Sequence, residues 1–171
     1  MAAHERPTTK GETMKYSPSQ IPAEARKKIC DAMLPVLVDG IDLHSQIKVA
    51  HWNIKGPQFA ALHPLFDTFA TDLAAHNDEL AERVRTLGSL AVGTVRHVAK
   101  HSRLADYPQD LTKDLEHVKL LAERISTYLV GARAAREVAQ EHKDDDSIDV
   151  LTGIVTMFEK HALFLQATLE G

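Results

Sequence analysis

Apolar residues between positions 62 and 87 recur at spacings of three, four and seven, which predicts one amphipathic helix. The apolar stripe consists of Leu62, Phe66, Phe69, Leu73, Leu80, Val84 and Leu87. Four potential metal ligands, His63, Asp67, Asp78 and Glu82, share a second stripe on the same helix. At about 100° per residue, the second stripe lies roughly 145° around the helix from the first. These ligands are therefore expected to point away from the core of their own subunit.

The spacing of these ligands along the helix favours a site shared between two subunits. His63 and Asp67 are one turn apart, as are Asp78 and Glu82, but the midpoints of the two pairs are separated by roughly 22 Å. A second copy, packed antiparallel about a two-fold axis near residues 72 and 73, would bring the first pair beside the partner's second pair. With His51 added, the donor set suits iron or manganese, and zinc is compatible with it.

Further segments show the apolar pattern of helices. They cover residues 19–52, 111–142 and 147–169, with a short helix expected at 94–103 inside the long connection 88–107. The first helix is expected to begin with Ser19 as its cap and Pro22 in its first turn. Pro35 should kink this helix or split off a short leading helix. Gly88 is expected to end the helix at 59–87.

The lengths of the connections predict the topology. The turns at 53–58 and 143–147 are short, so the two helices that each turn joins should be antiparallel. The connection at 88–107 is long and can carry the chain back across the bundle as a crossover. This order is typical of an all-α, ferritin-like four-helix bundle whose long crossover carries a short helix between helices two and three. The chain contains no Glu-x-x-His, the pair that usually ligates iron inside such a bundle. A metal centre in the core of one subunit is therefore not expected.

Composition narrows the class of protein. The 171 residues suit one domain, expected at 21–171 after a flexible polar arm at 1–20. Cys30 is the only cysteine, which excludes an internal disulfide and a cysteine zinc cluster. Neither a signal peptide nor a stretch of about 20 apolar residues is present, so a soluble, cytoplasmic protein is expected. The formal net charge of −4 does not favour nucleic-acid binding.

A specific run of residues identifies a family resemblance. The segment His51-Trp52-Asn53-Ile54-Lys55-Gly56, followed by His63, Asp67, Asp78, Glu82 and Arg83, resembles the Dps family, the miniferritins that protect DNA during starvation. The resemblance covers roughly residues 36–169. It implies a ferroxidase site in which His51, His63 and Asp67 of one subunit face Asp78 and Glu82 of its two-fold mate. It also implies that Trp52 lies beside the iron as an electron donor or radical trap, although a lone tryptophan more often packs in a core.

The resemblance also implies an assembly and a reaction. Dps subunits form a hollow dodecamer that oxidises ferrous iron, preferentially with hydrogen peroxide, and stores the ferric mineral inside. Iron is then substrate and cargo, and the partner is the same chain. One departure from the family is Pro64, where many relatives carry a glutamate that can help to nucleate mineral. Proline there is compatible with a first helical turn.

Four aspartates open the last predicted helix: Asp144, Asp145, Asp146 and Asp149. Carboxylates are favourable at a helix N-terminus, which accounts for part of this pattern. Around a three-fold axis of a shell, the same carboxylates would also form a negative funnel that draws in ferrous ions. The resemblance implies an acidic pore at this helix start, with Asp145 and Asp149 as the most favoured lining residues.

Two alternatives to the iron-oxidising cage remain at this stage. One is a nucleoid-associated DNA-binding protein whose metal site is only structural, in which many weakly basic arms add up through multivalency. Residues 1–20 carry Arg6, Lys10 and Lys15 against Glu5 and Glu12, a net charge of +1, so DNA binding through the arm should be weak. The other is a helical oligomer without metal, against which the outward stripe of ligands argues.

Overall fold

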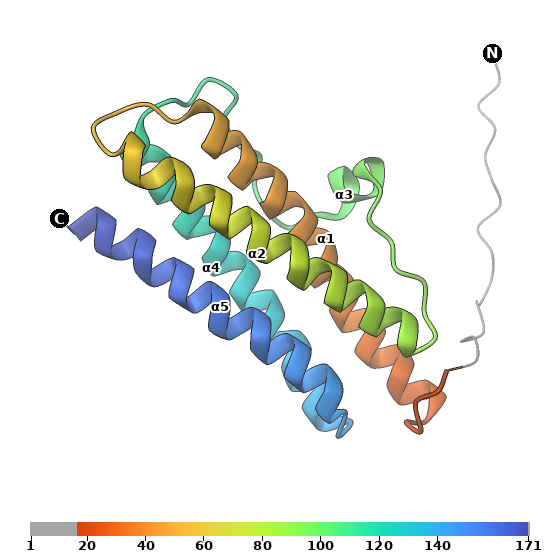
Figure 1. Ribbon diagram of the computed structural model, residues 1–171. Coiled ribbons are helices and arrows are strands. Elements are labelled where there is room, and N and C mark those ends of the chain that lie inside the picture. Colours follow the sequence, from red (N-terminus) through yellow and green to blue (C-terminus); the bar gives the residue numbers. More distant parts are fainter. Residues whose placement is uncertain (1–16, 171) are drawn as a thin grey trace, which may run out of the picture.

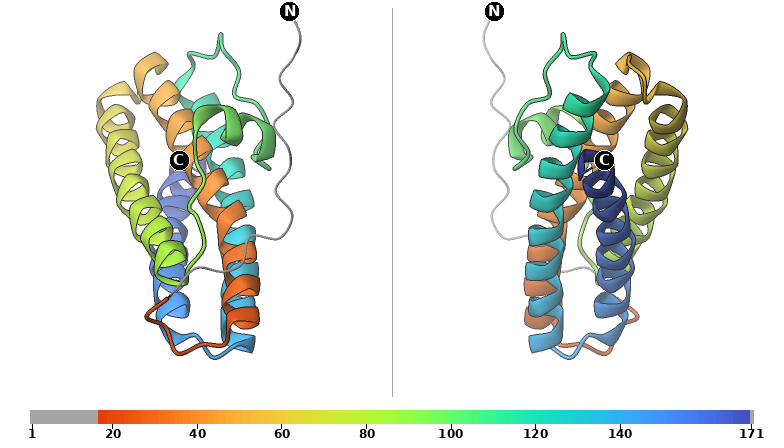
Figure 2. Two further views of the ribbon diagram at one scale, coloured as in Figure 1. Left: turned by 90° about the vertical axis from the view of Figure 1, so that its right-hand side faces the viewer. Right: turned by 90° about the vertical axis from the view of Figure 1, so that its left-hand side faces the viewer.

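The computed structural model describes residues 17–170, and within them the chain forms five helices (Figure 1). They are α1 (Ala23–Asn53), α2 (Phe59–Thr86), α3 (Val95–His101), α4 (Asp114–Glu141) and α5 (Asp145–Glu170). The four long helices run side by side as a bundle, and the short α3 lies outside it against α1 (Figure 2). The all-α four-helix bundle with a short helix in its crossover is confirmed.

The connections follow the predicted order. A short turn joins α1 to α2, another joins α4 to α5, and the chain between α2 and α4 crosses back along the bundle carrying α3 (Figure 1). Helix α1 packs on α2 and α4, and α5 packs on α4 and α2. The crossover returns the chain to the end of the bundle where α1 meets α2, so that Lys55 in that turn pairs with Lys113 just before α4. This pairing matters for the site described below.

The apolar stripe of α2 is buried, as predicted. Its seven residues are each at most 2% exposed, and they contact apolar side chains of the other long helices. Aromatic rings pair within this core: the ring centroids of Phe66 and Phe69 are 6.4 Å apart, and those of Tyr128 and Phe158 are 5.4 Å apart. Burying a side chain of this kind contributes about 1.5–3 kcal/mol. The opposite face of α2 is left out of this core.

Helix α1 differs from the prediction at two places. It begins at Ala23, and Ser19 is not its cap, because the Ser19 hydroxyl accepts the N–H of Ile21 instead. Pro22 precedes the helix and its carbonyl accepts the N–H of Arg26 at 3.0 Å. Pro35 lies inside one continuous helix, so the predicted leading helix is not split off. Buried neighbours on both sides of Pro35 hold the helix in the bundle despite the missing N–H.

The other helix ends agree with the sequence within a few residues. Gly88 ends α2 with φ +95°, and the N–H of Ser89 donates to the Val84 carbonyl at 3.2 Å. Helix α4 begins at Asp114, three residues after Leu111, whose side chain contacts the core from the preceding loop. No helix within residues 17–170 combines the length and the apolar character needed to cross a membrane.

The last residues of the predicted arm contact the bundle. The Ser17 hydroxyl donates to the Thr86 carbonyl at 2.5 Å, and the Arg26 guanidinium donates to the Leu87 carbonyl at 2.8 Å. These bonds satisfy main-chain oxygens at the C-terminal end of α2. The rest of the predicted arm, residues 1–16, lies outside the described part of the chain.

Candidate functional site

His51 and His63 face each other across the turn between α1 and α2. The Nδ1 atom of His51 lies 2.8 Å from the His63 carbonyl oxygen, and the Nδ1 atom of His63 lies 2.9 Å from the His51 carbonyl oxygen. The two rings stack with their centroids 3.8 Å apart. A carbonyl oxygen can only accept, so each Nδ1 carries the proton and donates it. In the neutral imidazole, Nε2 then has the lone pair with which a histidine binds a metal.

The local sequence explains why these two rings meet. Helix α1 ends at Asn53, and Ile54 is buried and fixes the chain as it leaves the helix. Gly56 has φ +146°, a conformation that favours glycine, and lets the chain reverse within a few residues. The last turn of α1 and the first turns of α2 therefore lie side by side. Helix α2 begins at Phe59, as predicted, so Pro64 lies in its second turn.

Asp67 adds a carboxylate one turn beyond His63. Its Oδ1 atom lies 2.6 Å from Nζ of Lys48, a residue of α1 one turn before His51. The hydrogen bond and positive charge of Lys48 lower the pKa of Asp67, and the nearby rings of His51 and His63 act in the same direction. Asp67 is therefore ionised, and Lys48 already occupies one of its oxygens.

Asp78 and Glu82 are exposed on the same outward face of α2, farther along the helix. Within residues 17–170, one chain brings together no group of three or more His, Cys, Asp and Glu side chains able to hold a metal ion. The structure thus places His51, His63 and Asp67 around one turn and leaves Asp78 and Glu82 apart from them. Trp52, next to His51, is 67% exposed and does not pack in the core of the subunit.

The acidic start of α5 divides into a buried and an exposed part. Asp144 is 2% exposed and accepts hydrogen bonds from the Arg83 guanidinium and the Ser147 hydroxyl. Its main-chain oxygen also accepts the first helical N–H, from Ile148, so Asp144 caps α5. Asp145, Asp146 and Asp149 are exposed, and Asp146 lies 3.4 Å from Arg83. All three present a carboxylate at the surface, and that of Asp146 is paired with Arg83.

Sequence reasoning did not single out Lys48. Its signal was present, because a lysine three residues before His51 lies on the same side of α1 as the histidine. The reciprocal bonds of His51 and His63 had no such signal, since they join side chains to main-chain oxygens of another helix.

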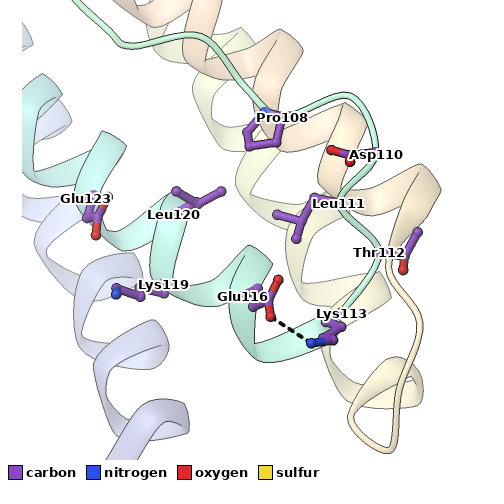
Figure 3. A pocket seen from close by; sticks show the side chains of 9 residues that line it. All are labelled: Pro108, Asp110, Leu111, Thr112, Lys113, Glu116, Lys119, Leu120 and Glu123. Atoms are coloured by element: carbon purple, nitrogen blue, oxygen red, sulfur yellow. Dashed lines mark hydrogen bonds and ion pairs between the residues drawn. The ribbon is translucent and has the colours of Figure 1, made fainter.

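A separate groove of about 510 Å³ lies at the start of α4 (Figure 3). Leu111 and Leu120 give it an apolar floor, and Lys113 and Glu116 at its edge form an ion pair of 3.1 Å. None of the predicted metal or pore residues lines it. The candidate site is therefore the outward face of α2, together with the end of α1.

Comparisons with known proteins agree with this geometry. Residues 32–171 match the ferritin-like domain family. The chain is 36% identical over 152 residues to a DNA protection during starvation protein of Agrobacterium fabrum, covering 89% of this chain and 94% of that protein. It is 32% identical to DNA protection during starvation protein 2 of Bacillus anthracis over 143 residues, covering 84% and 97%. The solved structure of DpsC from Streptomyces coelicolor has a TM-score of 0.88 at 32% identity, covering 95% of this chain and 96% of that one.

Proposed function

The chain belongs to the Dps family of ferritin-like proteins, and we propose that it is a ferroxidase that works at sites shared between two copies of itself. Membership places it among proteins of iron storage and DNA protection. The proposal goes further: ferrous iron is oxidised with hydrogen peroxide as the preferred oxidant, and the ferric product is stored inside a closed dodecamer.

One observation carries this proposal: main-chain oxygens hold Nδ1 of both His51 and His63, and Asp67, one helical turn after His63, is paired with Lys48. Two imidazoles and carboxylates suit iron or manganese. The same face of α2 continues to Asp78 and Glu82 about 22 Å away, which supports a two-fold partner that supplies the missing carboxylates.

The residues of this chain have distinct tasks in the reaction. The main-chain oxygens hold the rings of His51 and His63, so the two Nε2 atoms are aimed before iron arrives. Carboxylates neutralise the ferrous charge and stabilise the ferric product, which binds anionic oxygen more strongly. Lys48 neutralises Asp67 while the site is empty and must swing away when iron binds.

The electrons balance with peroxide as the only oxidant, and the protons balance once water takes part in forming the mineral. Two ferrous ions each give one electron to one hydrogen peroxide molecule, its O–O bond breaks, and both oxygens leave the reaction reduced to the level of water. Hydrolysis of the two ferric ions into oxyhydroxide mineral then releases protons. The exposed indole of Trp52 can supply an electron when only one ferrous ion is bound, which would keep hydroxyl radicals from escaping.

Iron needs a route into the shell, and the exposed carboxylates of Asp145 and Asp149 support one at the start of α5. Repeated around a three-fold axis, they would attract cations over a Debye length of about 8 Å at physiological salt. Asp144 has no part in this proposal, because its carboxylate is buried against Arg83.

Anomalous scattering from iron-soaked crystals tests the shared site. We expect iron within bonding distance of His51, His63 and Asp67 of one subunit and of carboxylates from its two-fold mate. Sedimentation at neutral pH should show a single species of about twelve subunits. Iron ligated by residues of one subunit only, or a protein that sediments as a monomer, would rule the proposal out.

A further inference from the structure

The turn between α1 and α2 is held from outside by the residues that lead into α4. The N–H of Lys55 donates to the Thr112 carbonyl at 2.7 Å, and the N–H of Asp114 donates back to the Lys55 carbonyl at 3.0 Å. Figure 3 shows Thr112 and Lys113 where the chain passes beside the turn and enters α4. Two chain segments more than fifty residues apart are thus joined at the base of the candidate site.

The side chain of Asp114 completes this connection. Its Oδ2 atom accepts the N–H of Gln58 at 2.8 Å, at the point where α2 begins, and its Oδ1 atom accepts the N–H of Leu115 at 2.9 Å. Asp114 is 8% exposed, so the carboxylate is largely removed from water. A buried carboxylate is unfavourable unless its oxygens are hydrogen-bonded, and here the turn provides one of the donors.

Gly56 makes room for this carboxylate. A Cβ atom on Gly56 would lie 2.2 Å from Oδ2 of Asp114, well inside van der Waals contact. The φ of +146° at Gly56 is also one that side chains rarely adopt. The turn and the aspartate therefore fit each other, and a side chain at position 56 would displace the carboxylate of Asp114.

We infer that Asp114 is a positioning residue for the metal site: by fixing the turn at 54–58, it sets the separation of His51 and His63. The inference rests on the proposed function. The two histidines flank this turn, and each ring is oriented by a main-chain oxygen on its far side. A main-chain shift of about 1 Å would take both bonds beyond hydrogen-bond distance and release both rings. Asp114 contacts no metal ligand and acts only through the turn.

A simpler role for Asp114 predicts different behaviour. An acidic residue in the first turn of α4 also stabilises that helix through its dipole. In that case a short helix-capping side chain such as serine should be able to take over the role of Asp114. A clamp on the turn instead requires a side chain that is long enough to place an accepting oxygen at the Gln58 N–H. The side chain of asparagine is long enough, and that of serine is too short.

Optical titration of the full assembled protein with Co²⁺ alone, a redox-stable substitute for ferrous iron, separates the two roles. Asp114→Ala and Asp114→Ser should each weaken Co²⁺ binding by about tenfold or more, as loss of support behind metal ligands commonly does. Asp114→Asn should recover most of the affinity. Thermal unfolding of the same variants reports on α4, where Asp114→Ser should resemble wild type more closely than Asp114→Ala.

Neighbouring substitutions provide the controls. Gly56→Ala should weaken Co²⁺ binding as Asp114→Ala does, whereas Glu116→Gln, in the exposed ion pair two residues farther along α4, should leave it unchanged. Wild-type affinity in Asp114→Ser, or no recovery in Asp114→Asn, overturns the inference even if Asp114→Ala fails to fold. Wild-type protein that binds no Co²⁺ would instead overturn the proposed function.

Discussion

Lys48 holds Asp67 in an ion pair of 2.6 Å between Nζ and Oδ1, at the oxygen that the proposed metal site requires. The lysine therefore competes with iron for one ligand. Replacing Lys48 by methionine keeps the length of the side chain and removes the competing charge. We expect Lys48→Met to tighten Co²⁺ binding by about fivefold or less, because an exposed ion pair is weak.

The pair of Lys27 and Asp31 provides a matched control for this variant. It has the same separation of 2.6 Å between Nζ and a carboxylate oxygen and lies near the beginning of α1. Lys27→Met should leave Co²⁺ affinity unchanged. A weaker affinity in Lys48→Met would show that Lys48 helps to hold the site and does not compete for it.

Removing Asp78 and Glu82 together should abolish rapid oxidation of ferrous iron by peroxide while leaving folding intact. These carboxylates are exposed on the face of α2 opposite Leu80 and Val84, so no core contact is lost. Stopped-flow absorbance of Asp78→Asn/Glu82→Gln against wild type checks the rate. Glu79→Gln, an exposed change on the same helix, is the control, and wild-type kinetics in the double variant would exclude this site.

Asp145→Asn/Asp149→Asn should slow iron uptake, with the largest slowing at low ionic strength, where attraction to the proposed pore is least screened. Uptake measured from 10 mM to about 500 mM salt should converge for variant and wild type at the high end. Glu137→Gln, an exposed change on α4, controls for a general loss of negative charge. Equal uptake at every salt concentration would reduce the acidic run to a feature of the helix start.

DNA should be retarded weakly or not at all in a gel-shift assay at physiological salt. Residues 1–20 carry a net charge of +1, and the chain as a whole carries −4, so few phosphates can be neutralised. Any residual binding should disappear when residues 1–15 are deleted. Strong DNA binding by the protein that lacks residues 1–15 would show that DNA binds to a basic surface outside the arm. That result would favour the DNA-binding alternative.

Acid should destabilise the subunit through its buried histidines. Burial lowers the pKa of His161, which is 3% exposed and stacks on Phe69 at 4.0 Å, although Asp72 partly opposes the shift. The unfolded chain then binds a proton near pH 6.5 that the folded chain binds only at lower pH, so the free energy of unfolding decreases as pH falls below about 6.5.

Thermal unfolding between pH 5 and pH 8 checks this sign. His161→Gln should unfold with a smaller dependence on pH than wild type, while His142→Gln, a partly exposed change after α4, should keep the wild-type slope. A His161→Gln protein with an unchanged slope would assign the effect to His44 or His117, whose pKa values burial also lowers.

Helical periodicity was enough to predict the bundle, because each long helix has one apolar stripe and α2 keeps its polar ligands strictly on the other side. It was not enough at Ser19, because its hydroxyl accepts the N–H of Ile21 and the main-chain oxygen of Pro22 accepts the N–H of Arg26 at the start of the helix. Spacing rules describe residues within a helix, so they found His63, Asp67, Asp78 and Glu82. They could not reveal the hold of Asp114 on Gln58, which depends on the crossover returning the chain to that end of the bundle.

On α2, one set of side chains holds the subunit together and a different set faces outward with the ligands. Substitutions of Asp78 and Glu82 therefore remove no core contact of the subunit, and the chemistry of the shared site is what preserves these two carboxylates. Lineages that no longer need oxidation can lose these ligands one by one while the bundle persists. A conserved bundle is thus poor grounds for assigning activity to a relative, and the outward residues of α2 are the ones to inspect.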